Sequence, residues 1–187
     1  MEKILHLLLA GIFLSGCGGP DPSVETAASA PVSSASEAPR GEKMPAGEIY
    51  FEFEGYGPGI SHTGGFTDIE ISLYTENGRI TGFDGVINSG SVMTDIERLT
   101  SHLKSEDFFN SGAYPTIQFQ SYSIINENDQ TVLRGNLSFR GVERETSFPV
   151  DVSGNAIESE FMLDTSNHGL SYTGVNDLVR IKFRFGI

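Results

Sequence analysis

Most of the chain after Gly47 alternates between apolar and polar residues with a period of two. This alternation is typical of β-strands that bury one face and expose the other. The Asn77–Gly78 pair between two such runs is a strong signal for a tight β-hairpin. The pattern therefore predicts roughly eight strands, within residues 48–54, 67–74, 80–87, 116–125, 133–140, 147–152, 157–163 and 179–185.

Only one segment has the periodicity of a helix. Apolar residues recur at helical spacing from Ile96 to Leu103, which predicts a short helix with one apolar face. Thr94 and Glu97 have the spacing of a capping box, so we expect Thr94 to be the N-cap residue of this helix. The segment 165–177, which contains His168, is expected to be a long polar loop.

The segment 101–120 is the least generic part of the sequence. It carries two adjacent phenylalanines, Phe108 and Phe109, on a connection between elements. Each ring has a large apolar area that has to be buried somewhere. Tyr114–Pro115 then begins a strand, where a proline removes no ladder hydrogen bond. We interpret the segment as a lid over the mouth of a barrel, with the glycine-rich stretch 55–65 as a mobile hairpin connection beside it.

These elements together predict the fold class. Strands that are apolar on one face only are best satisfied by an antiparallel barrel or sandwich. We expect an all-β, eight-stranded antiparallel lipocalin-like β-barrel with one short helix and a lid segment. Eight strands enclose either a packed core or one ligand. The pattern leaves both alternatives open, because both would use the same inward-facing residues.

Composition narrows the choice of partners. At 187 residues and 38% hydrophobic, the chain is long enough for one substantial core. A net charge of −13 would repel a nucleic-acid backbone, so no nucleic-acid partner is expected. Tryptophan is absent, whereas 13 phenylalanines are present, which favours a site lined by purely apolar rings.

The N-terminus resembles a bacterial lipoprotein signal. Lys3 precedes an apolar run, 4–14, that is too short to span a bilayer as a mature helix. Small residues then lead to Cys17, the only cysteine. We predict a signal peptide over residues 1–16 and lipidation of Cys17 with acyl chains such as palmitate. The alternative is an ordinary secretory signal with an incidental cysteine.

The next segment, 17–46, is rich in Pro, Ser, Ala and Glu and has no sustained apolar period. Such a composition cannot bury enough surface to order itself, which predicts a disordered tether. The barrel domain would then comprise residues 47–187. Gly18, not aspartate, follows Cys17, which favours an anchor in the outer membrane facing the periplasm.

No catalytic or metal-binding motif is present. The three histidines of the domain, His62, His102 and His168, show neither HxH nor HExxH spacing, and no Gly-x-Ser-x-Gly sequence occurs. We therefore expect no metal, no cofactor and no enzymatic activity. His102 is the histidine best placed to donate a hydrogen bond at the barrel mouth.

Six blocks of the domain stand out from the general alternation. They are Ser91–Asp95, His102–Ser105, Asp107–Phe109, Tyr114–Phe119, Gly135–Val142 and Val175–Val179. These blocks resemble the YceI-like family of bacterial envelope proteins, and the similarity spans essentially the whole domain in the right order. That resemblance implies an extended lipocalin-like barrel that binds isoprenoid or similar long apolar molecules.

Three polar features of the family are missing here. The chain has Glu54–Gly55 where Lys-His is usual, Leu99–Thr100 where Arg-Asp is usual, and Thr165 where an arginine is usual. The apolar framework is kept while candidate contacts to a charged head group are lost. The departures therefore favour a neutral quinone or amide over a pyrophosphate.

We thus expect a protein that binds and carries or stores a long apolar lipid of isoprenoid, quinone or fatty-amide type in the cell envelope. A filled-barrel interaction module without a lipid ligand is the main alternative, and a lipid hydrolase is a weaker one. A membrane contact through the N-terminal anchor is expected, and a homodimer is compatible with the sequence. The predicted ligand contacts are Phe51, Phe53, Phe66, Ile71, Phe83, His102, Leu103, Phe108, Phe109, Tyr114, Phe119, Phe139, Phe148, Phe161 and Phe183.

Overall fold

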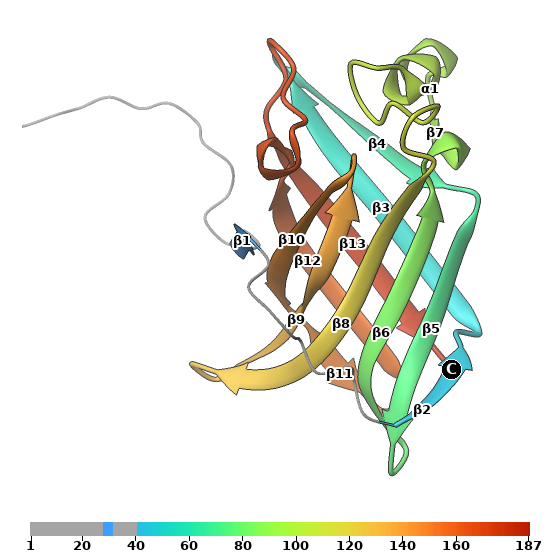
Figure 1. The fold of residues 1–187 in the computed structure, drawn as a ribbon, viewed down its shortest axis with the longest axis vertical. Coiled ribbons are helices and arrows are strands. Elements are labelled where there is room, and N and C mark those ends of the chain that lie inside the picture. The colour runs from blue at the N-terminus through green and yellow to red at the C-terminus, as the bar shows by residue number, and fades with distance from the viewer. Residues whose placement is uncertain (1–27, 32–40) are drawn as a thin grey trace, which may run out of the picture.

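The computed structural model describes residues 28–31 and 41–187. They form an all-β structure with one short α-helix, which confirms the predicted fold class (Figure 1). The predicted signal peptide, 1–16, and the predicted lipidation site, Cys17, lie outside the described residues. In the described part of the chain, no helix has the length and apolar character needed to cross a membrane.

The strands form two antiparallel sheets that face each other across a shared interior (Figure 1). The first sheet has the order β1 (Ala28–Pro31), β10 (Val142–Pro149), β9 (Gln130–Phe139), β8 (Thr116–Glu127), β6 (Arg79–Asn88), β5 (Ile69–Glu76) and β2 (Glu42–Pro45). The second has the order β11 (Asp151–Ser153), β12 (Ala156–Asp164), β13 (Leu178–Gly186), β3 (Glu48–Gly57), β4 (Ile60–Phe66) and β7 (Val92–Thr94).

The chain passes between the two sheets at corners that hold them together. Between β2 and β3, the Ala46 N–H donates to the Ile71 carbonyl of the first sheet at 2.9 Å. The next residue, Gly47, donates to the Gly186 carbonyl of the second sheet at 2.8 Å. Between β10 and β11, the Val150 N–H donates to the Thr131 carbonyl at 2.8 Å. The inward faces of both sheets therefore contribute to one interior.

The described residues contain more strands than the eight expected, and β4 shows why. The stretch 55–65 was predicted to be a mobile connection, yet most of it belongs to β3 and β4. A Cβ atom on Gly64 would lie 2.4 Å from the ring of Phe53 and 2.7 Å from the Met93 carbonyl oxygen. The glycine is therefore required for close packing within a strand, a use of glycine that sequence pattern alone does not distinguish from flexibility.

Two strands also lie within the predicted tether. β2 pairs with β5, so the ordered domain begins before the predicted boundary at Gly47. Met44 packs against the core, which gives this short strand an apolar contact that a tether would lack. β1 pairs with the edge of β10, from Ala28 opposite Ser147 to Pro31 opposite Arg144.

The helix α1 spans Glu97–Lys104, as predicted, but its capping box is wrong. Its N-cap residue is Ile96, and no side chain caps it. Thr94 ends β7 instead, where its hydroxyl accepts a hydrogen bond from the Ile96 N–H at 3.2 Å and lies 2.9 Å from the Thr100 hydroxyl. Thr94 therefore shapes the turn into the helix without being its first residue. Two short 3₁₀ helices, η1 (Ser89–Ser91) and η2 (Thr165–His168), complete the fold.

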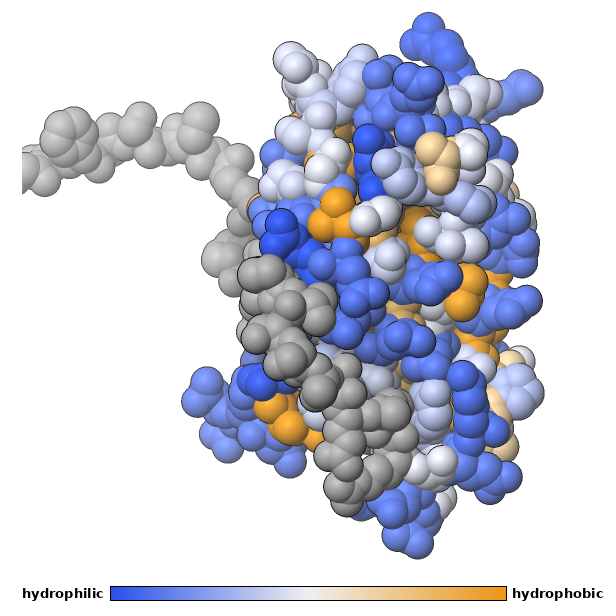
Figure 2. Space-filling view, in the orientation of Figure 1, coloured by the Kyte–Doolittle hydropathy of each residue, from blue (hydrophilic) through white to orange (hydrophobic). Residues whose placement is uncertain are grey.

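The interior contains two groups of packed apolar residues. The lid cluster has Phe53, Val92, Leu103 and Phe108 at its centre and lies beneath α1 and the segment after it. The distal cluster fills the other end of the sheets, whereas the outer face seen in Figure 2 is mostly hydrophilic. The buried members of the distal cluster are Ile71, Leu73, Ile80, Phe83, Phe119, Leu133, Phe148, Val150, Ile157, Phe161, Phe183 and Phe185.

Candidate functional site

An apolar cavity of about 270 Å³ lies between the two sheets and reaches from the lid cluster into the distal cluster. Both sheets supply its wall, because inward-facing side chains alternate along each strand. All but two of the predicted ligand contacts line it. These are Phe51, Phe53, Phe66, Ile71, Phe83, Leu103, Phe108, Phe109, Phe119, Phe139, Phe148, Phe161 and Phe183.

The two exceptions are His102 and Tyr114, which do not line the cavity. His102 lies on α1 next to the inward-facing Leu103, and its Nε2 atom is 3.0 Å from the carboxylate of Asp107. Successive helical residues point in different directions, so one apolar face of α1 cannot include both. Tyr114 packs over Gly141, where a Cβ atom would lie 2.8 Å from its ring. Both residues were predicted from family blocks, which do not reveal the direction of a side chain.

The segment after α1 covers one end of the cavity. Its backbone is held by local hydrogen bonds, such as Phe109 N–H to the Leu103 carbonyl at 2.9 Å. Phe108 is buried, and its ring lies 5.0 Å from that of Tyr172 in the loop after η2. Phe109 packs on Phe66 with 5.6 Å between ring centroids. The segment thus has the position that the lid interpretation requires, while its opening remains a prediction.

Polar groups are concentrated where the cavity meets solvent. Tyr56, His62, Asn176 and Asp177 all belong to the lining there. The Asn176 N–H donates to the Tyr56 carbonyl at 2.8 Å, which joins the β3–β4 hairpin to the loop before β13. None of the described residues that line the cavity is a lysine or an arginine. The opening is therefore polar but offers no lysine or arginine to an anionic group.

An ion-pair network on the outer face supports this hairpin. The carboxylate of Glu54 accepts a hydrogen bond from the Tyr56 hydroxyl at 3.1 Å and pairs with Arg180 on β13. Hydrogen bonds from the Ser61 and Tyr56 hydroxyls, together with the Arg180 guanidinium, lower the pKa of Glu54. Glu54 is thus ionised and already partnered.

Thr165 has a structural role at a position where the resemblance implies an arginine. Its side chain is buried, and its hydroxyl lies 3.0 Å from both the Leu170 and the Asp177 carbonyl oxygens. These contacts pin both ends of the loop 166–176 to one point. Thr165 therefore anchors the cavity-lining loop.

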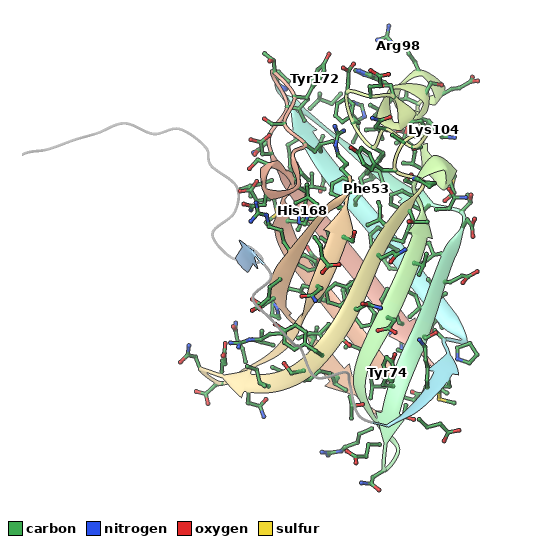
Figure 3. The ribbon with its side chains drawn as sticks, in the orientation of Figure 1. Phe53, Tyr74, Arg98, Lys104, His168 and Tyr172 are labelled. Atoms are coloured by element: carbon green, nitrogen blue, oxygen red, sulfur yellow. The ribbon has the colours of Figure 1, made fainter. Side chains whose placement is uncertain are left out.

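His168 anchors the same loop from the other side. It is fully buried, and its Nδ1 atom lies 3.2 Å from the Val142 carbonyl oxygen. Burial lowers the pKa of His168, so the ring is neutral and donates through Nδ1. Figure 3 shows it beneath the loop, away from Tyr172 at the tip. Its role is packing, and in the part of the chain that the structure describes no group of His, Cys, Asp or Glu is placed to hold a metal ion.

Some cavity residues were not predicted from the sequence. Several lie on strands or on α1, among them Leu99, Leu137 and Ile181, and the others lie in the β3–β4 hairpin and the stretch 165–177, for which the sequence predicts a flexible connection and a polar loop. The only available signal was the presence of apolar residues inside the second segment. The missed residues that matter most are Tyr56, Gly57, His62, Leu170, Tyr172 and Val175.

The fold and the cavity define a class of protein: antiparallel β-structures that enclose an apolar space of ligand size. Within this class, the family model of the YceI-like domain matches residues 44–187, and the chain belongs to this family. A UPF0312 protein of Pseudomonas paraeruginosa is 30% identical over 99 residues, which are 53% of this chain. The matched region covers 49% of that relative, so the chain spans about half its length.

Solved structures resemble the same fold at low sequence identity. BcnA of Burkholderia cenocepacia is 17% identical, with a TM-score of 0.66 over 73% of this chain and 94% of that one. A polyisoprenoid binding domain from Saccharophagus degradans is 14% identical, with a TM-score of 0.56 over 76% of this chain and 95% of that one. At these identities the likeness establishes the fold alone.

Proposed function

We propose that this protein binds one long, neutral apolar lipid and carries or stores it in the bacterial cell envelope. The observation that carries the proposal is the cavity of about 270 Å³, whose wall is built mainly of phenylalanine and aliphatic side chains. A filled-barrel interaction module would need no such continuous apolar space. The cavity therefore favours a carrier over that alternative.

The volume of the cavity bounds the length of the ligand. At about 10 to 15 Å³ for each water-sized group, the cavity accommodates on the order of 20 such groups. At about 0.8 kcal/mol per CH₂, burying 20 of them gives a gross gain of about 16 kcal/mol. Ordering the ligand offsets part of this gain. A chain of about 20 carbons fits inside, and a longer isoprenoid would extend through the opening.

The polar groups at the opening favour an uncharged head group. Asp177 is the only carboxylate in the lining, and lysine and arginine are absent from the described lining residues. An anionic head such as a pyrophosphate would meet no lysine or arginine there, whereas the carbonyl of a quinone or amide can accept a hydrogen bond from the Asn176 side-chain amide. We therefore place quinones and fatty amides above phosphorylated isoprenoids.

Other features agree with a binding protein. The Saccharophagus degradans neighbour is described as a polyisoprenoid binding domain, which supports an apolar ligand for this chain. His102 pairs with Asp107, and His168 contacts a backbone carbonyl, so both have partners other than a serine hydroxyl. A lipid hydrolase of the Ser-His-Asp type would require a different arrangement. We propose a non-enzymatic role, anchored by lipidated Cys17 and, by preference, at the outer membrane.

A plug in the cavity tests the proposal. Leu137 on β9 faces the cavity, and its neighbour Ser138 points to the other side of the sheet. We expect Leu137→Trp to weaken uptake of added quinone at least tenfold, about 1.4 kcal/mol, while Ser138→Trp leaves uptake unchanged. Fluorescence titration measures uptake, and circular dichroism checks folding. Equal quinone uptake in the folded plug variant and the wild type would refute the proposed site.

A further inference from the structure

Exposed apolar side chains gather at the lid end of the molecule. Ile60, Met93, Ile96 and Tyr172 are 56%, 50%, 41% and 38% exposed. Figure 3 shows Tyr172 and Arg98 at this end, far from Tyr74 near the opposite end. Similarly exposed apolar residues, such as Ile49 and Ile187, lie away from the lid, so what sets this group apart is its position beside the cavity opening. We call these four residues the apolar rim.

Two members of the apolar rim, Ile60 and Tyr172, adjoin the cavity. Ile60 follows the hairpin turn, where its side chain lies 3.7 Å from a Cβ position on the cavity-lining Gly57. Ile96 is the N-cap residue of α1, the helix whose Leu99 and Leu103 line the cavity. Tyr172 itself belongs to the lining. A molecule that leaves the cavity at this end would therefore meet apolar side chains before it meets water.

Electrostatic attraction does not identify the surface that the apolar rim would contact. Arg98 and Lys104 are exposed on α1, but Glu97 and Glu106 lie exposed nearby, and the chain carries a net charge of −13. Mixed charges on an acidic protein give no net attraction to an anionic surface. The insertion of apolar side chains is the remaining driving force, and a lipid bilayer is the surface that rewards it.

The predicted anchor also leaves the lid end within reach of a membrane. Eleven positions separate Cys17 from Ala28, a span of at most about 36 to 40 Å. Ala28 pairs with Ser147, five positions along β10 from Val142 at the lid end, or about 17 Å. A bilayer that holds acylated Cys17 can therefore meet the apolar rim without loss of the β1–β10 pairing.

We propose that the apolar rim docks the lid end on a phospholipid bilayer, so that the ligand passes between cavity and membrane without crossing water. This inference rests on the proposed function, since a docked mouth matters only for a lipid carrier. It adds an orientation: α1 and the loop after η2 face the membrane, and the β5–β6 hairpin points away from it.

Fluorescent labels at the two ends test the orientation. Cys17 is the only native cysteine, so Ile60→Cys and Asn77→Cys each add one site for an environment-sensitive dye. The full chain, as recovered from the envelope, is mixed with phosphatidylcholine vesicles, and labelled wild type reports any free Cys17 thiol. We expect the dye at Ile60→Cys to gain emission about threefold or more, while the dye at Asn77→Cys, in the opposite turn, stays unchanged. Added phosphatidylglycerol should bring no further gain.

A second variant separates docking from ligand binding. Ile60→Ser, Met93→Ser and Ile96→Ser together should slow transfer of a preloaded pyrene-labelled isoprenoid to vesicles about tenfold or more, because less apolar surface enters the bilayer. Native mass spectrometry should show unchanged loading. The matched control changes three similarly exposed residues elsewhere, Ile49→Ser, Val86→Ser and Ile187→Ser.

The outcomes distinguish the two proposals. Equal dye responses at both ends, no response at Ile60→Cys, or a response that requires phosphatidylglycerol would overturn the docking of the apolar rim. Equal transfer rates in the two triple variants would overturn it too. An empty chain whose Ile60→Cys dye still enters vesicles would instead remove the lipid-carrier function and leave the docking in place.

Discussion

The distal cluster and the lid cluster are both rich in phenylalanine, yet their backbones differ. In the distal cluster, Phe148 and Phe161 stack at 4.3 Å with an interplanar angle of 2°, on strands that are paired along their length. In the lid cluster, Phe108 and Phe109 lie on turns held by bonds to residues only a few positions away. Rings on paired strands form a fixed wall, while rings on turns can move without breaking a sheet.

We propose that the two ends have different functions. The distal cluster closes one end of the cavity and supplies stability through buried area. The lid cluster closes the other end through ring contacts such as Phe108 with Tyr172. The same residue type therefore serves stability at one end and access at the other, and substitutions should separate these two effects.

The largest effect is expected in the distal cluster. Phe161→Ala removes a buried ring from its stack with Phe148 and should lower the free energy of unfolding by about 3 to 5 kcal/mol. Urea denaturation measures the change. A loss below 1 kcal/mol, less than the usual cost of a core phenylalanine, would show that the distal cluster is not the stabilising core.

Substitutions in the lid should change the rate of ligand release more than the free energy of unfolding. Phe108→Ala with Phe109→Ala should lower the free energy of unfolding by only about 1 to 2 kcal/mol, because the lid can open without unfolding the sheets. Release of bound lipid should accelerate at least tenfold, which is about 1.4 kcal/mol of barrier. Stopped-flow fluorescence measures release. The control is Phe108→Leu with Phe109→Leu, which keeps most of the volume of the two side chains. Unchanged release in the alanine variant would exclude a gate at these residues.

The wall of the cavity was predictable from the sequence because alternation fixes which side chains share a face. Phe51 and Phe53, or Phe183 and Phe185, could be placed inward from period two alone, and the structure confirms that all four line the cavity. Apolar burial dominates these positions, so the local pattern and the final packing agree.

The ends of the cavity were harder to predict, since their residues obey no single period. His102 and Leu103 are neighbours in one family block, but only the second faces the cavity. Position 64 requires glycine because the Phe53 ring and the Met93 carbonyl crowd its Cβ position, and those contacts come from other segments. Thr94 has the spacing of a capping box, yet it is the last residue of strand β7. Tertiary contacts decided each of these cases.

A pH dependence should arise beside the lid end, at His168. Burial lowers the pKa of His168 below 6.5, so as pH falls below about 6.5 the unfolded chain takes up a proton that the folded chain does not. The free energy of unfolding should then fall by up to about 1.4 kcal/mol per pH unit, until the folded pKa is reached. His168→Phe should remove this component, while Arg144 and Asp164 remain in both proteins. Urea denaturation across that pH range measures the free energy of unfolding of both proteins. An equal change of this free energy with pH in the wild type and in His168→Phe would contradict the prediction.

The smallest effect is expected on the outer face of β13. Lys182 lies 3.6 Å from the Glu160 carboxylate, and its side chain is about half exposed. Lys182→Gln should therefore change the free energy of unfolding by less than about 0.5 kcal/mol, whereas the adjacent, inward-facing Phe183→Ala should cost several times more. Thermal unfolding of the pair compares the two faces of one strand. Equal losses would contradict the assignment of inside and outside.

The most direct test of the central claim is native mass spectrometry of the chain purified without exposure to exogenous lipid, followed by organic extraction. The lipid-carrier account predicts one stoichiometric apolar molecule with a neutral head, whose release on extraction leaves a folded protein that takes up added quinone. A clean apo mass together with no uptake of added quinone would contradict the account and favour the filled-barrel interaction module.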